Sequence, residues 1–219
     1  MMQLRQWRDE KDPGIFYNYW ISFPSDYRLG KKYPLILFMH GAGEVGPDVE
    51  KVRVHGVPKI IEKEPYRDIQ AITVSPQCPG GKLWFTQYPD VMRFLRAVIA
   101  EYPVDEDAVT VTGLSMGGYA TFFLAQLYPG FFAAAAPVCG GGIPWIAGDT
   151  LRDIPIRMYH GDRDDVVPTV ESIQMCDRIQ AAGNKDCSLV ILHNVGHDSW
   201  VYAYEQTDLI EWLAAQRRK

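Results

Sequence analysis

The sequence has no long apolar run and no excess of positive charge, and each absence excludes a class of function. None of its hydrophobic segments approaches the roughly 18 residues that a helix needs to cross a bilayer. The formal net charge of −5 gives no electrostatic attraction to nucleic acid or to an anionic membrane surface. We therefore predict a protein that binds neither nucleic acid nor membrane.

Paired cysteines and metal-binding spacings are also missing. The four cysteines form no C-x-x-C pair and no zinc pattern, so we expect buried free thiols at positions 78, 139, 176 and 187. The acidic run that begins at Asp162 lacks the glycine that a calcium loop needs at its sixth position. These observations predict a protein without a bound metal or other cofactor.

The N-terminal segment is polar and lacks the apolar middle of a signal peptide. A cytoplasmic location is therefore expected. A secreted protein trimmed of its signal would have the same sequence, so that alternative stays open.

The chain of 219 residues contains no internal repeat and no low-complexity linker, which predicts one domain over residues 1–219. Strand-like and helix-like segments alternate through its last three quarters. This alternation is typical of an α/β protein with a mainly parallel sheet and helices on both faces. The predicted strands cover residues 15–23, 34–39, 71–75, 109–112, 131–138, 154–160 and 188–193, and the predicted helices cover 89–102, 119–128, 170–182 and 207–216.

The stretch AVTVTGLSMGG, residues 108–118, joins a β-branched strand to a helix through a G-x-S-x-G sequence. This pattern is typical of the sharp turn that exposes a nucleophilic serine in many hydrolases. Ser115 stands at its apex. Gly113 and Gly117 flank the serine at positions where a Cβ atom would meet the neighbouring strand or helix. The turn therefore predicts Ser115 as a nucleophile, which needs an adjacent base to accept its proton.

Three further loops that follow predicted strands carry chemically suggestive residues. They read HGAGEVG over residues 40–46, HGDRDDVVP over 160–168 and GHDSW over 196–200. Together with GLSMGG, these motifs resemble single-domain esterases of the α/β-hydrolase superfamily. The resemblance extends from about Tyr33 to the end of the chain and is greatest to the phospholipase/carboxylesterase, dienelactone-hydrolase-like and predicted-peptidase group.

The resemblance implies a Ser-Asp-His triad in that order along the chain. It implies Ser115 as the nucleophile, His197 as the base and Asp164 as the acid that orients the imidazole. Asp165 remains an alternative acid. Asp162 is expected to tie down its turn.

The resemblance also implies an oxyanion hole of two backbone N–H groups. One belongs to Met116, and the second belongs to Ala42, with Gly43 as the alternative donor or as a substrate contact. His40 and His160 are expected to pack at strand ends and to shape their loops.

Three tryptophans, Trp84, Trp145 and Trp200, follow different predicted strands. Two interpretations stay open, because these side chains could line a substrate cleft or could cover edges of the sheet. The segment 139–153 is too short for a large lid, so an α/β-hydrolase fold without a large lid and with an antiparallel N-terminal strand is expected.

The function predicted from the motifs is that of a serine carboxylesterase. It would hydrolyse short-chain or aryl esters through an acyl-enzyme, with a small-molecule ester as its partner and no prediction of oligomeric state. Two enzymatic alternatives stay open, namely a small serine peptidase or amidase and a feruloyl or acetyl esterase acting on plant polysaccharide. A third interpretation is a hydrolase fold that has lost catalysis and serves as a binding module.

Overall fold

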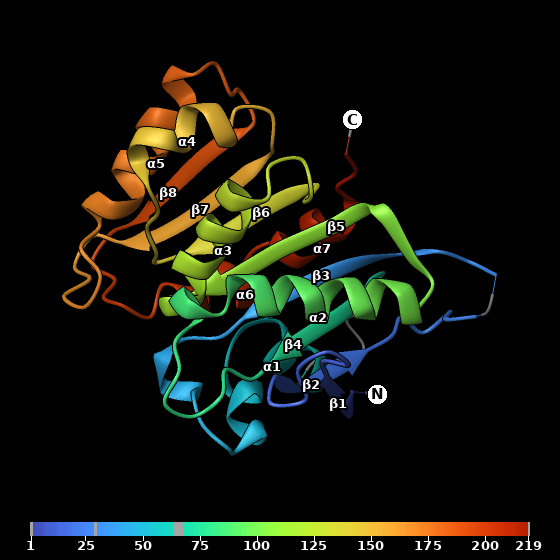
Figure 1. Cartoon of the computed structure of the whole chain (residues 1–219). Coiled ribbons are helices and arrows are strands. Elements are labelled where there is room, and N and C mark those ends of the chain that lie inside the picture. Colours follow the sequence, from blue (N-terminus) through green and yellow to red (C-terminus); the bar gives the residue numbers. More distant parts are fainter. Residues whose placement is uncertain (1, 29, 64–67, 219) are drawn as a thin grey trace.

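A computed structural model describes residues 2–28, 30–63 and 68–218, and an eight-stranded sheet forms its centre (Figure 1). The spatial order of the strands is β1-β2-β4-β3-β5-β6-β7-β8. Strands β3 to β8 are parallel to one another, whereas β1 and β2 run antiparallel to their neighbours. The strands are β1 (Gln3–Arg8), β2 (Phe16–Ser22), β3 (Tyr33–Met39), β4 (Ile72–Pro76), β5 (Val104–Leu114), β6 (Ala134–Val138), β7 (Ile156–Gly161) and β8 (Cys187–Leu192).

Helices cover both faces of this sheet, as the alternating pattern predicts (Figure 1). One face carries α2 (Tyr88–Glu101), α3 (Met116–Leu127), α4 (Pro144–Thr150) and α5 (Val170–Ala181). The other face carries α1 (Gly56–Lys63), α6 (Trp200–Glu205) and α7 (Leu209–Ala215). Three short 3-10 turns complete the secondary structure, η1 (Ala42–Glu44), η2 (Val49–Val54) and η3 (Trp84–Thr86).

Strand β3 shows why the sheet is buried on both sides. Its side chains alternate between the two hydrophobic cores, with Leu35 and Leu37 in the core beneath α2 and α3, and Ile36 and Phe38 in the core beneath α1 and α7. All seven residues of the strand are buried. A continuous apolar sequence is therefore required here, because each face of a central parallel strand meets a helix layer.

The N-terminal part differs from the prediction. The sequence indicates one antiparallel strand, but the structure has two, because β1 pairs with β2 along its whole length. Nearly every β1 residue is exposed, so no burial pattern marks this strand. Its one aromatic side chain, Trp7, stacks on Tyr17 with ring centroids 6.1 Å apart. Helices α1, α4 and α6 are also absent from the predicted elements.

The loops that follow β3, β5, β6, β7 and β8 all leave the same edge of the sheet, called here the carboxyl edge. The connection between β6 and β7 contains only α4, which confirms the prediction of a fold without a large lid. All four cysteines are buried and free, as predicted. Within the described ranges, no helix combines the length and the apolar character that crossing a membrane requires.

Candidate active site at the carboxyl edge

The turn at Ser115 has the strained backbone that the G-x-S-x-G motif predicts. Ser115 has φ 55° and ψ −119°, a region that residues with a side chain rarely occupy. A Cβ atom at Gly117 would lie only 1.9 Å from the carbonyl oxygen of Met39, and one at Gly113 would lie 2.5 Å from the same oxygen. Only glycine lets α3 begin this close to the end of β3.

A continuous chain of hydrogen bonds joins Ser115, His197 and Asp164. The Nε2 atom of His197 lies 2.8 Å from the Ser115 hydroxyl, and its Nδ1 atom lies 2.8 Å from Oδ2 of Asp164. The three residues come from the loops after β5, β8 and β7. The geometry is that of a hydroxyl held by a base, with the base oriented by a carboxylate.

Asp164 is fixed more firmly than its neighbour Asp165. Its side chain is completely buried, and its Oδ1 atom accepts hydrogen bonds from the N–H groups of Val166 (3.0 Å) and Val167 (2.8 Å). Burial raises the pKa of the Asp164 carboxyl, but the hydrogen bonds from His197 and these amides lower it below its ordinary value on balance. Asp165 is exposed. The structure thus brings Asp164, and not Asp165, to the imidazole.

Two buried histidines hold the neighbouring loops in shape, as predicted. His40 contacts the carbonyl of Gly41 through Nδ1 (2.6 Å) and accepts the N–H of Cys78 on Nε2 (2.9 Å). Burial lowers the pKa of His40 to about 4, so this side chain is neutral at pH 7. His160 contacts the Ser172 hydroxyl through Nδ1 and the Val167 carbonyl through Nε2.

The predicted oxyanion donors lie at the starts of two helical turns. Met116 is the first residue of α3 and Ala42 is the first residue of η1, so their N–H groups have no acceptor within their own helices. The loop that carries Ala42 packs against Ser115, since a Cβ atom at Gly41 would lie 3.6 Å from the Ser115 Cβ. Gly43 follows in the same turn and is exposed.

Glu44 is a residue of this loop that the sequence analysis does not single out. It is 8% exposed, and its buried Oε2 atom has no hydrogen-bond partner. Burial raises the pKa of its carboxyl above the ordinary value. The same oxygen lies 3.1 Å from the point that a Cβ of Gly41 would occupy. A carboxyl group therefore lies directly behind the loop of the predicted oxyanion hole.

Asp162 joins the acid loop to the histidine loop. Its Oδ1 atom accepts the N–H of Asn194 (2.8 Å), and its Oδ2 atom contacts Nδ1 of His193 (2.7 Å). Hydrogen bonding to His193 is the main cause that lowers the pKa of Asp162. The predicted role in tying down the turn fits these contacts, which reach across to the loop of His197.

The three tryptophans have different environments. Trp84 is completely buried, and its Nε1 donates to the carbonyl of His40 (3.1 Å), so the interpretation of this side chain as cleft lining is wrong. Its indole packs against the rings of Tyr17 and His40 in the core. Trp145 is 80% exposed on α4. Trp200 lies against the imidazole of the predicted base, with its ring centroid 5.2 Å from that of His197.

Comparison with known proteins places this arrangement in a fold family. A thermostable esterase superposes with a TM-score of 0.88 at 29% identity, over 99% of this chain and 63% of that one. The acetyl xylan esterase from Aspergillus awamori superposes with a TM-score of 0.72 at 16% identity, over 96% of this chain and 99% of that one. The chain has the α/β-hydrolase fold.

Two sequence comparisons agree with that assignment. Residues 82–157 of this α/β-hydrolase match the prolyl oligopeptidase family. A bifunctional acetylxylan esterase/xylanase, XynS20E of Neocallimastix patriciarum, is 28% identical over 144 residues. That match covers 64% of this chain and 20% of the relative, so the α/β-hydrolase chain corresponds to only a part of the longer protein.

A fourth group, Cys139, lies beside the triad of this α/β-hydrolase. Its thiol is within 4.8 Å of ligand atoms of Asp164 and His197, residue types that also occur in metal sites. Burial raises the pKa of the Cys139 thiol to about 12, so the thiol keeps its proton and is a poor metal ligand at neutral pH. The absence of a metal stays a prediction.

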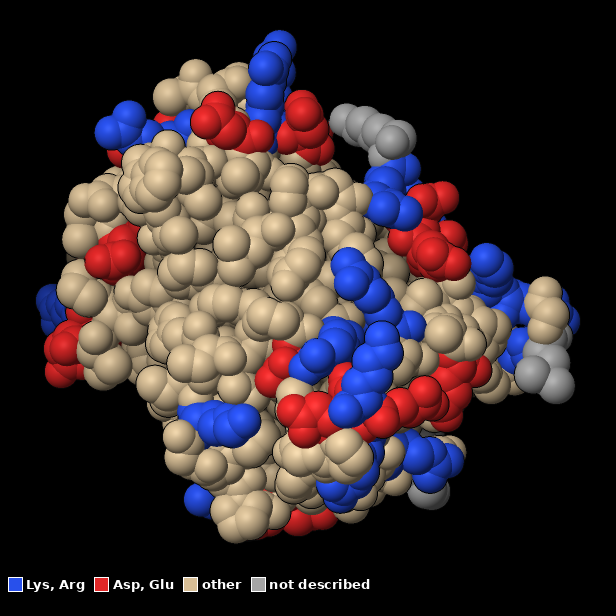
Figure 2. Space-filling model, in the orientation of Figure 1, with Lys and Arg blue, Asp and Glu red and all other residues tan. Residues whose placement is uncertain are grey.

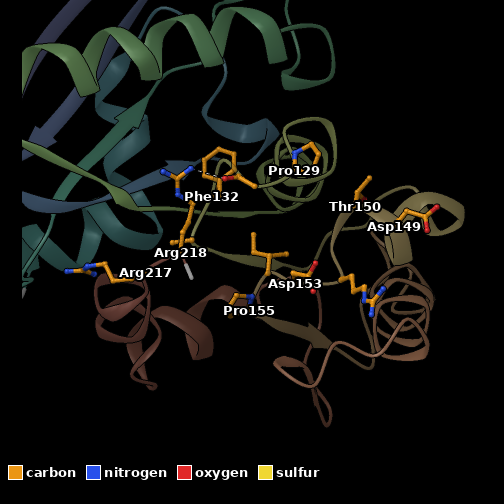
Figure 3. A pocket seen from close by; sticks show the side chains of 12 residues that line it. Pro129, Phe132, Asp149, Thr150, Asp153, Pro155, Arg217 and Arg218 are labelled. Carbon is orange, nitrogen blue, oxygen red and sulfur yellow. Dashed lines mark hydrogen bonds between the residues drawn. The ribbon is translucent and has the colours of Figure 1, made fainter.

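A hollow of about 500 Å³ lies at the opposite, amino edge of the sheet, beside the starts of β6 and β7 (Figure 3). Phe132, Pro155 and Arg218 line it. The backbone N–H of Arg218 donates to the Asp107 carbonyl (2.7 Å), and its side chain donates to the Gly130 carbonyl (2.9 Å). No member of the triad or of the predicted oxyanion loop lines this hollow.

Proposed function

We propose that this chain is a serine carboxylesterase. The observation that carries the proposal is the unbroken hydrogen-bonded chain from Asp164 through His197 to Ser115. Its similarity to proteins described as esterases supports the same assignment.

The proposed reaction begins when His197 takes the proton of the Ser115 hydroxyl through Nε2 while Oγ attacks the ester carbonyl carbon. The carbonyl oxygen becomes an oxyanion, which the N–H groups of Met116 and Ala42 stabilise in this proposal. The imidazolium, stabilised by Asp164, then gives its proton to the departing alkoxide oxygen. An alcohol leaves and an acyl-enzyme remains.

Water completes the cycle. His197 accepts one proton from the water molecule, the resulting hydroxide adds to the acyl carbon, and Ser115 Oγ leaves with that proton. The products are a carboxylic acid and the free enzyme. Neither step uses a group outside the chain, the ester and water, in keeping with the expectation of a reaction without a metal or cofactor.

The finer parts of the assignment belong to the proposal as well. We take residues 1–219 as one catalytic domain that acts on a small ester, binds neither nucleic acid nor membrane, and works in the cytoplasm. Short acyl chains or aryl esters fit a site without a large lid. Esters on plant polysaccharide are a related candidate, because acetyl xylan and feruloyl esterases share the fold.

A peptidase is the second candidate, favoured by the match of residues 82–157 to the prolyl oligopeptidase family. Hydrolysis of p-nitrophenyl acetate and of peptide p-nitroanilides by the same preparation separates the two. We expect the ester to be cleaved at least 100-fold faster. Faster cleavage of the anilides would contradict the esterase assignment.

Replacement of the nucleophile tests the proposal directly. Ser115→Ala should lower kcat for p-nitrophenyl acetate by roughly 10⁶-fold, because the covalent step is lost. It should also abolish labelling by a fluorophosphonate probe while leaving the thermal unfolding transition in place. A variant that hydrolyses the ester at the original rate would refute the mechanism. A wild-type protein that takes no label would favour the binding-module interpretation.

A further inference from the structure

Tyr119 and Glu171 are two polar residues that lie close to each other and take no part in the predicted triad. Tyr119 is one helical turn beyond Ser115 on α3, and its N–H donates to the Ser115 carbonyl (3.0 Å). Glu171 belongs to the first turn of α5. Both side chains are half-buried. They approach each other over the loop that leaves β6.

Gly141 in that loop shows how close the two side chains are. A Cβ atom at this position would lie 2.5 Å from Oε2 of Glu171 and 2.9 Å from Cε1 of Tyr119. Any side chain at position 141 would therefore displace the carboxylate or the ring. The glycine leaves room for both polar groups to lie together.

The chemical states of this pair are complementary. Burial, the charges of Glu171 and Asp164, and a side-chain hydrogen bond to Glu171 together raise the pKa of Tyr119 to about 12. The phenol is consequently an un-ionised O–H group at neutral pH. A carboxylate accepts hydrogen bonds, whereas a phenol can both donate and accept. The pair thus presents an acceptor and a donor side by side.

Apolar surface adjoins this pair. The ring of Phe85, which is 42% exposed, meets Tyr119 edge to face with centroids 5.8 Å apart. Trp145 is exposed on α4, which packs against α5. On the face of the molecule that carries α2 to α5, a broad area without charged side chains lies left of the centre of the view, and charged side chains lie around its rim (Figure 2). A carboxylate paired with a phenol and adjoined by apolar side chains is suited to a neutral ligand that has both hydroxyl groups and apolar ring faces.

We propose that Tyr119 and Glu171 form a hydroxyl-recognition site, and that the substrate is an ester of a sugar or similar polyol with a free hydroxyl near the ester bond. Tyr119 and Glu171 are hydrogen-bonded to each other, and a ligand hydroxyl can insert into this bond because it accepts from the phenol and donates to the carboxylate. A cation would use the carboxylate alone. This inference rests on the proposed esterase function and identifies the alcohol part of the substrate ester.

The test compares two acetate esters that differ in their hydroxyl groups. p-Nitrophenyl acetate has none, and a mono-O-acetylated methyl β-xylopyranoside retains two. Glu171→Ala should lower kcat/KM for the sugar acetate by about 10-fold or more, the range of a lost hydrogen bond to a charged group. Tyr119→Phe should lower it by about 5-fold. For the aryl ester, kcat/KM of both variants should stay within 2-fold of the wild-type value.

Two controls belong to this experiment. Asp177→Asn removes an exposed carboxylate from the same helix, α5. It should leave kcat/KM unchanged for both esters. Thermal unfolding of each variant establishes that the fold is retained. Glu171→Gln, which keeps the shape and loses the charge, should fall between wild type and Glu171→Ala on the sugar acetate.

Four results would overturn the inference. If the variants lose kcat/KM equally on both esters, the pair has a structural role. If they lose none on the sugar acetate, the pair does not recognise the substrate hydroxyl. Preference for acetylcholine that disappears in Glu171→Gln would identify a cation site instead. If the wild-type protein hydrolyses neither ester, the esterase function itself fails, and this inference fails with it. Hydrolysis of both esters without an effect of the variants rejects the inference alone.

Discussion

The two edges of the sheet differ in backbone strain. Among the described residues, three non-glycine residues have positive φ, and all three follow strands at the carboxyl edge, namely Ser115, Cys139 and Asn194. The amino edge has the hollow of about 500 Å³, but there glycines such as Gly130 and Gly183 supply the positive φ values. Strain and converging polar groups, rather than the size of a hollow, mark the candidate active site.

The largest expected difference between the edges concerns catalysis. Asp164→Asn should lower kcat by about 10⁴-fold, because an amide in this position no longer stabilises the imidazolium and favours the wrong tautomer of His197. Steady-state hydrolysis of p-nitrophenyl acetate measures the loss. Asp165→Asn in the same loop and Arg218→Ala at the amino edge should each change kcat by less than 2-fold. If Asp165→Asn has the larger effect, the acid of the triad is misassigned.

The second comparison concerns glycines at the two edges. Gly117→Ala should lower the free energy of unfolding by about 3 kcal/mol or more, because the added Cβ would lie 1.9 Å from a backbone carbonyl that cannot move away cheaply. Gly130→Ala has open space but φ +76°, and should lower the free energy by about 1–2 kcal/mol. Urea unfolding measures both. Equal losses would mean that the turn at Ser115 is not tightly packed.

The smallest effect concerns buried polar groups and depends on pH. At the amino edge, Asn184 is satisfied, since its Nδ2 donates to the carbonyls of Leu151 and Ile154 and its Oδ1 accepts the N–H of Asp186. At the carboxyl edge, Glu44 has a buried oxygen without a partner. Glu44→Gln should therefore stabilise the protein at pH 7, whereas Asn184→Ala should destabilise it by about 1–3 kcal/mol.

The sign of the pH dependence follows from the raised pKa of Glu44. The folded protein binds this proton more tightly than the unfolded chain, so the wild type loses stability as the pH rises from about 4.5 through the pKa of the folded state. The stabilisation by Glu44→Gln should consequently be smaller at pH 4.5 than at pH 7 in urea unfolding. A constant difference at both pH values would show that Glu44 does not titrate abnormally.

Features that depend on local sequence could be predicted well. The turn at Ser115 needs two glycines within five residues, and these are visible in the sequence. The loops after the parallel strands could be predicted to lie together, because the carboxyl ends of parallel strands meet at one edge of the sheet. The joining of Ser115, Asp164 and His197 follows from that rule and from the family resemblance.

Features that depend on contacts between distant segments could not be predicted. Strand β1 is exposed on both faces and is specified by its backbone pairing with β2, which leaves no periodic pattern. The complete burial of Trp84 depends on its position beneath α2 and beside His40. Glutamate is a residue type that is usually exposed, and Glu44 is buried only because of how η1 packs.

The two ends of the described chain have a practical consequence. Arg218 is fixed at the amino edge by Asp107 and Gly130, and β1 runs in the direction of β4, so its start points away from the carboxyl edge. Both ends lie on the right of the view, whereas the parallel strands end on the left (Figure 1). Tethering the chain through either end to a solid support should thus orient the immobilised molecules with the carboxyl edge facing the solution.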